Sequence, residues 1–99
     1  MKLRTALGSV IRDTRLLRRM TLRDLSNTTT VALGYISELE RGQKEASSEI
    51  LERLADGLST TVSDLVIDAA IRMADYDALI NDGYDLAVAH RLHTEPTTV

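Results

Sequence analysis

The chain has 99 residues and no cysteine, which allows one compact domain and excludes both disulfide bonds and thiolate metal sites. Its apolar runs are shorter than the roughly 18 residues of a membrane helix, and charges come too early for a secretory signal, so we expect a cytoplasmic protein. Residues 1–45 carry nine Lys or Arg against five Asp or Glu, whereas residues 46–99 carry three against ten. This asymmetry indicates a polyanionic partner for the first half, the alternative being two ordinary solvated surfaces that differ by chance.

A first amphipathic helix is predicted over residues 3–18 because its inward positions recur at helical spacing. These positions are Leu3, Leu7, Val10, Ile11, Thr14 and Leu17. Thr21 then caps a short second helix with Leu22, Leu25 and Ser26 inward, and Asp24 is placed to close a capping box. The next residues, "NTTTV" at 27–31, are poor in helix formers and indicate a turn.

Three more helices follow in the pattern. The third covers residues 32–40 and ends before Gly42, where a left-handed cap is expected. The fourth begins at Ser47 or Ser48 and ends at Leu58. The fifth begins near Val62 and continues to about Ile80, before the helix-breaking pair Asp82-Gly83.

Residues 84–92 are expected to form one more short helix, and residues 93–99 a frayed tail. No strand alternation occurs, so the predicted fold class is all-α. We expect a five-helix domain over residues 1–66, a helical extension over 67–92 and a flexible tail over 93–99.

Glu40 falls on the same helix face as the inward residues Ile36 and Leu39. A carboxylate on a buried face must be solvated at the rim or paired, since an isolated buried charge costs several kcal/mol. Arg15 and Arg18 both flank the apolar stripe of the first helix, and periodicity does not choose between them as the partner.

The motif "GYISELERG" followed by "SSEILERLADGL" resembles the Cro and phage-repressor type of helix-turn-helix domain, the XRE family, and the similarity covers residues 3–66. Within that family, "LRDL", "GYISELERGQKE" and "SSEIL" resemble the ClgR-like actinobacterial regulators of Clp protease genes. The resemblance implies a lambda-repressor-like fold in which Arg15 pairs with Glu40. It also implies a bacterial, sequence-specific DNA-binding transcription regulator that binds a palindromic operator as a homodimer, with the third helix in the major groove of double-stranded DNA.

The positions that match the family's base-facing set are Thr30, Ala32, Leu33, Gly34, Ser37 and Glu38. Residues suited to phosphate contacts are Arg23, Arg41, Gln43 and Lys44. The chain departs from the family where Thr30 replaces a common turn glycine, Ala32 a Ser or Thr cap, and Leu22 a glutamine. No Arg, Asn or Gln precedes Arg41 on the exposed front of this helix. We therefore expect either modest specificity or a dependence on DNA shape and on contacts from the loop at 43–45.

Ala69, Met73, Tyr76 and Ile80 form an apolar stripe that either makes a homodimer seam, which we favour, or folds back on the chain's own domain. A rival to the regulator is an antitoxin or protein-binding adaptor whose acidic C-terminal part holds a basic partner.

His90 and His93 have no third ligand candidate, so no metal is expected. No catalytic triad or phosphate-binding glycine loop is found, so we expect neither enzymatic activity nor a cofactor.

Overall fold

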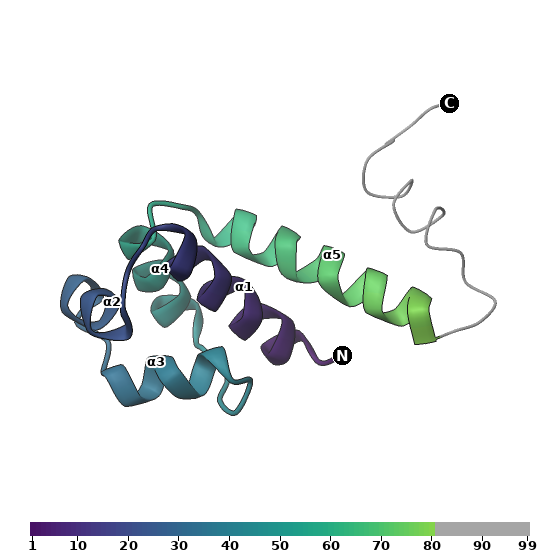
Figure 1. The fold of residues 1–99 in the computed structure, drawn as a ribbon, viewed down its shortest axis with the longest axis horizontal. Coiled ribbons are helices and arrows are strands. Elements are labelled where there is room, and N and C mark those ends of the chain that lie inside the picture. Colours follow the sequence, from purple (N-terminus) through teal and green to yellow (C-terminus); the bar gives the residue numbers. More distant parts are fainter. Residues whose placement is uncertain (81–99) are drawn as a thin grey trace.

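The computed structural model describes residues 1–80, which form five α-helices and no strand (Figure 1). The helices are α1 (Leu3–Leu17), α2 (Leu22–Thr29), α3 (Leu33–Glu40), α4 (Ser48–Gly57) and α5 (Val62–Ile80). Their bounds agree closely with the predicted ones, and the all-α prediction is confirmed for this part of the chain. The expected helix over 84–92, the tail over 93–99, the Asp82-Gly83 break and both histidines lie outside the described residues.

The caps that begin and end these helices follow from local chemistry. The Thr21 Oγ1 accepts the Asp24 N–H at 3.0 Å and the Thr21 N–H donates to the Asp24 carboxylate at 2.9 Å, which completes the predicted capping box. Ser47 caps α4 by accepting the Ile50 N–H at 3.2 Å. Gly42, with φ of +73°, takes the left-handed conformation expected after α3.

Helix α1 lies at the centre of the fold, with α3 on one side and α5 on another (Figure 1). Its residues Ala6, Val10 and Ile11 are completely buried, because the helix has apolar positions on more than one face. They meet aliphatic side chains of every other helix in a single core, whose members include Leu25, Ile36, Leu54, Leu58 and Leu65. Each such side chain contributes about 1.5–3 kcal/mol through burial.

Gly8 permits an unusually close approach between α1 and α3. A Cβ at this position would lie 2.1 Å from the Leu39 carbonyl oxygen and 2.9 Å from that of Glu40. The last turn of α3 therefore rests directly on the backbone of α1. Gly57 plays a similar part between α4 and α2, since a Cβ there would lie 2.4 Å from Thr29 Cγ2.

Helix α5 folds back along α1, which corrects part of the predicted dimer seam. Ala69 is completely buried in the core of the chain, and Met73 packs partly buried against it. Arg72 fastens the two helices by donating from Nη1 to Asp13 Oδ2 at 2.8 Å and to Ser9 Oγ at 2.9 Å. Ala69 is thus unavailable to a partner, and the fold-back alternative holds for this stretch.

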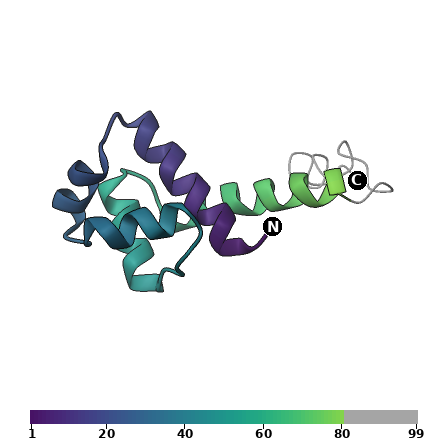
Figure 2. The same cartoon turned by 60° about the horizontal axis from the view of Figure 1, so that its bottom comes forward.

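The later turns of α5 extend past the N-terminus of α1, as Figure 2 shows from below. The predicted division after residue 66 falls inside this continuous helix. The Met1 ammonium lies 3.8 Å from Asp77 Oδ1, so the start of the chain also lies against α5. Among residues 1–80, no helix is long and apolar enough to cross a membrane.

Candidate nucleic-acid interface

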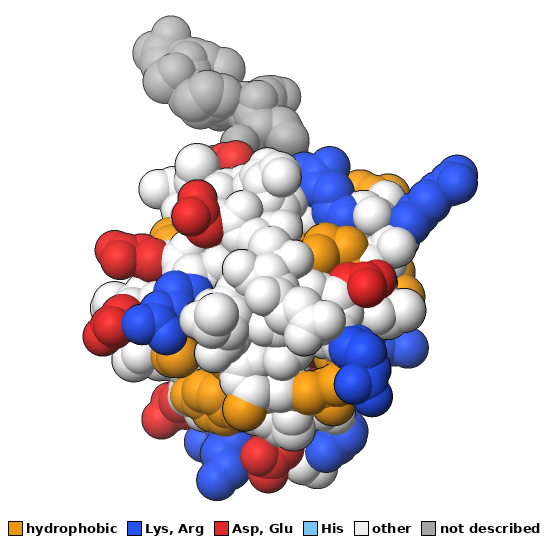
Figure 3. All heavy atoms as spheres, turned by 90° about the vertical axis from the view of Figure 1, so that its left-hand side faces the viewer, with side chains coloured by type: hydrophobic (Ala, Val, Ile, Leu, Met, Phe, Trp, Pro, Cys, Tyr) orange, Lys and Arg blue, Asp and Glu red, His pale blue; other side chains and the backbone are white. Residues whose placement is uncertain are grey.

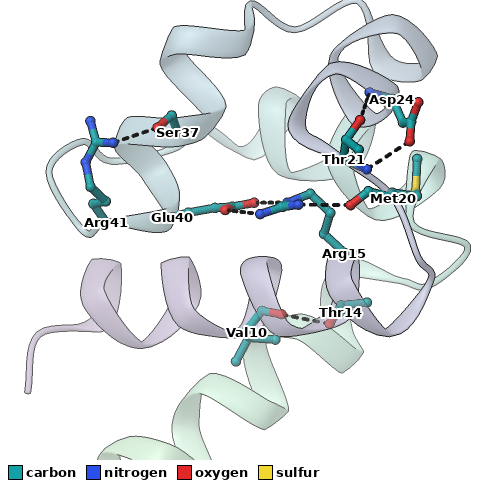
Figure 4. A network of polar contacts seen from close by, with 9 residues as sticks. All are labelled: Val10, Thr14, Arg15, Met20, Thr21, Asp24, Ser37, Glu40 and Arg41. Carbon is teal, nitrogen blue, oxygen red and sulfur yellow. Dashed lines mark hydrogen bonds and ion pairs between the residues drawn. The ribbon is translucent and has the colours of Figure 1, made fainter.

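An ion pair between α1 and α3 holds the candidate interface helix in place (Figure 4). The guanidinium of Arg15 donates from Nε to Glu40 Oε2 at 2.7 Å and from Nη2 to Glu40 Oε1 at 2.9 Å. Its Nη1 donates to the Met20 carbonyl oxygen, in the turn between α1 and α2, at 2.9 Å. One side chain therefore joins α1, α3 and the turn that leads into α2.

This pair is nearly removed from water, since the exposed fractions of the two side chains are 9% and 5%. Hydrogen bonding to Glu40 raises the pKa of Arg15 above its ordinary value, against the opposing effect of burial. The other candidate, Arg18, instead donates to the carbonyl oxygens of Leu58 at 2.9 Å and Ser59 at 3.4 Å. The structure thus joins the two residues that the resemblance pairs.

A tight turn between α2 and α3 fixes the angle at which α3 leaves α2. Thr30 has φ of +58° and ψ of +20°, a left-handed conformation that is uncommon for a β-branched residue. Two hydroxyl groups support the turn, because Ser26 Oγ donates to the Val31 carbonyl at 2.6 Å and Thr29 Oγ1 to that of Leu25 at the same distance. The glycine often found here in the family has a physical reason, since glycine adopts this conformation without strain.

One side of α3, together with the residue before the helix, is left uncovered by the described residues. Ala32, Leu33 and Gly34 are exposed there, and Ser37 and Glu38 are partly exposed. No atom lies within 4 Å of the position that a Cβ would take on Gly34, apart from its chain neighbours and its own helix. This side can therefore approach another molecule closely.

Figure 3 shows the end of the molecule where α2 lies. Uncharged groups occupy the centre of this view, and basic and acidic side chains are mixed around them. The positive charge of residues 1–45 therefore does not form a uniform patch at this end.

The structure links three of the sequence-predicted residues at the C-terminal end of α3. Arg41 donates from Nη1 to Ser37 Oγ at 2.7 Å and from Nη2 to Gln43 Oε1 at 3.5 Å. Tyr35, which the sequence prediction did not include, steadies the following loop by donating from its hydroxyl to the Glu45 carbonyl at 2.8 Å. Lys44 in this loop and Arg23 on α2 are both exposed.

Comparisons with known proteins agree with this arrangement. A helix-turn-helix family model, HTH_3, matches residues 11–65, which contain the capped α2, the left-handed turn and the exposed α3. The chain belongs to this helix-turn-helix family, of the XRE type that includes the Cro and phage repressors. It is accordingly a transcription regulator with a helix-turn-helix DNA-binding domain.

The more particular likeness is to ClgR. The chain is 43% identical over 76 residues to the transcriptional regulator ClgR of Mycobacterium tuberculosis, which covers 77% of this chain and 68% of that protein. A crystal structure of the clp gene regulator ClgR from Corynebacterium glutamicum superposes with a TM-score of 0.74 at 40% identity, covering 95% of this chain and 96% of that one. The restriction-modification controller protein C.AhdI from Aeromonas hydrophila, at 22% identity and a TM-score of 0.61, shares the fold; 63% of this chain and 94% of that one are covered.

Proposed function

We propose that this chain represses or activates bacterial genes by binding a palindromic operator as a homodimer, with α3 in the major groove. The observation that carries the proposal is the contrast between the two ends of α3. Its C-terminal end is held by Glu40 and by the close contact at Gly8, while Leu33 and Gly34 at its N-terminal end are exposed. Such a regulator acts where the chromosome lies, so the proposal places it in the cytoplasm.

The proposed base contacts follow from the chemistry of the exposed side. Leu33 and Ala32 suit the methyl group of thymine, and Glu38 can accept from the cytosine amino group. Ser37 donates to or accepts from a base edge. Thr30 lies in the turn ahead of these residues and completes the set.

Backbone contacts supply affinity and position in this proposal. Arg23 on α2 and Arg41, Gln43 and Lys44 after α3 are exposed and suited to phosphate oxygens. The exposed front of α3 has no Arg, Asn or Gln side chain before Arg41 that could make two hydrogen bonds to one base. In this proposal, sequence-dependent DNA shape therefore supplies part of the specificity.

The test is selection from a pool of random duplexes, followed by affinity measurements over a range of salt concentrations. The selected sites should be palindromic, with half-sites about 34 Å apart along the DNA. The logarithm of the affinity should fall by about 0.9 per phosphate contact for each tenfold rise in salt. Absence of enrichment at low salt would contradict the proposal.

The adaptor remains a second candidate because Asp64, Asp68 and Asp77 are exposed along α5. Replacing these three residues with Asn should leave operator affinity intact if the chain is a regulator. An adaptor would instead lose a stoichiometric basic partner in a pull-down that compares the triple variant with the unmodified chain.

A further inference from the structure

An open groove lies among α1, α2 and α3, beside the Arg15–Glu40 pair. Its walls are formed by Arg12, Arg15, Leu22, Ser37, Glu40 and Arg41. The sequence prediction gave no role to Arg12, which lies on α1 and is exposed. The groove therefore brings an unassigned arginine to the same place as Ser37 and Arg41 of the proposed interface.

The charges of this groove do not balance. Arg15 and Glu40 neutralise each other through their two hydrogen bonds, which leaves Arg12 and Arg41. Among the described residues, Arg12 has no carboxylate within ion-pair distance, and the neighbouring Asp13 is held by Arg72. Within residues 1–80, the hydrogen bonds of the Arg41 guanidinium go to the neutral oxygens of Ser37 and Gln43.

Two uncompensated guanidinium groups that flank one groove are suited to a phosphate group. Arginine remains charged at every physiological pH, and its planar fork matches phosphate oxygens. Ser37 also lines the groove while facing the side of α3 that we expect to meet bases. A phosphate in the groove would thus belong to a nucleotide close to the base that α3 reads.

We propose that Arg12 and Arg41 together hold a backbone phosphate of the bound DNA strand, so that α1 forms part of the DNA interface. This inference rests on the proposed function and adds a contact from outside the helix-turn-helix pair. When Arg41 turns to the phosphate, it releases the Ser37 hydroxyl for a base edge. Backbone contact and base reading are coupled through this one hydrogen bond.

The experiment compares Arg12→Gln, Arg41→Gln and the double variant with the unmodified chain on a selected operator duplex. Arg53→Gln is the matched control, because Arg53 is a half-exposed arginine on α4 that pairs with Glu49 and does not line the groove. The double variant should lower the slope of log affinity against log salt by about 1.8 for the homodimer on its operator, because one phosphate contact, worth about 0.9, is lost in each half-site. It should weaken binding equally for matched and mismatched operators, while Arg53→Gln changes neither quantity.

An unchanged slope in the double variant would overturn the proposal while leaving the proposed function standing, since the unmodified chain would still bind its operator. Melting temperatures serve as the folding check, because both arginines are exposed and their replacement should not move the transition. A second arm titrates inorganic pyrophosphate and follows amide signals around the groove. Weak pyrophosphate binding, in the millimolar range, fits a DNA phosphate, whereas micromolar binding lost in the double variant would assign the groove to a free polyphosphate and overturn the proposal.

Discussion

At the scale of single residues, the Arg15–Glu40 pair is expected to contribute most to the stability with which α3 is held. Arg15 makes three hydrogen bonds, and two of them end on Glu40 in a setting that water hardly reaches. The partner of a nearly buried charge cannot be removed without leaving that charge uncompensated. The pair therefore matters more for stability than an exposed ion pair such as Arg53 with Glu49.

Replacing Glu40 with Ala should lower the free energy of unfolding by about 3–5 kcal/mol, because Arg15 would keep only its bond to the Met20 carbonyl. Chemical denaturation followed by circular dichroism measures this loss. Adding Arg15→Met to the same chain should recover part of it, since no buried charge would remain. An unfolding free energy within about 0.5 kcal/mol of the unmodified chain would show that the pair does not hold α3, because substitutions without such a role stay in that range.

Asp24 should make the free energy of unfolding fall as the pH is lowered. The backbone N–H of Thr21, followed by its side chain, lowers the pKa of this exposed carboxyl below its usual value. The contribution of the capping box is therefore fully present above the ordinary Asp pKa of about 3.9 and is lost as the pH falls through the lowered value. Unfolding measured below about pH 5 should be more pH-dependent in the unmodified chain than in Asp24→Asn. Equal curves would contradict this assignment.

At the scale of elements, the closeness of α1 and α3 depends on Gly8. Gly8→Ala would press a methyl group against the Leu39 carbonyl, so α3 must move away from α1 and strain the Arg15–Glu40 pair. We expect a loss of about 1–3 kcal/mol, the usual cost of overpacking, despite the better helix propensity of alanine.

Gly34→Ala is the matched control, because the same methyl group would meet empty space. It should stabilise the chain by up to about 1 kcal/mol through helix propensity. The same variant should weaken operator binding if the α3 backbone lies against DNA. Equal thermal stability of the two alanine variants would show that the contact at Gly8 is not restrictive.

The sequence predicted the elements well because caps and periodicity are local properties. Thr21, Asp24, Ser47 and Gly42 act within a few residues of their own positions. The choice between Arg15 and Arg18 was not local, since both flank the same stripe and only the packing of α4 brings Leu58 to Arg18. The role of Gly8 was missed for the same reason, because a glycine inside a helix gives no sign of the backbone it will meet.

At the scale of the whole molecule, one part of the apolar surface of α5 packs on the chain's own core and another part is exposed. Ala69 was expected at a partner because the sequence does not reveal that α1 has a second apolar face for α5. Tyr76 and Leu79 remain 43% and 68% exposed on the turns that extend past α1, and Val66 and Ile67 are exposed nearer the body. These residues carry the proposed homodimer contact.

Replacing Tyr76 and Leu79 with Ser should shift the proposed dimer to monomers without unfolding the domain, because both side chains are exposed. Sedimentation velocity at micromolar concentration, with and without operator DNA, measures the change. Affinity for a full palindrome should fall much more than affinity for a single half-site. A chain that sediments as a monomer before any substitution would exclude the homodimer.

The three hydrogen bonds of Arg15 have a consequence for how the DNA specificity of such regulators can change. Because the guanidinium of Arg15 holds α3 through Glu40, the exposed side chains of Ala32 and Leu33 are not needed to hold the helix in place. Under the proposed base contacts, substitutions at these positions would change the operator that is bound, while the placement of α3 on the domain would stay the same. New target genes would then be within reach of single changes, without any redesign of the scaffold.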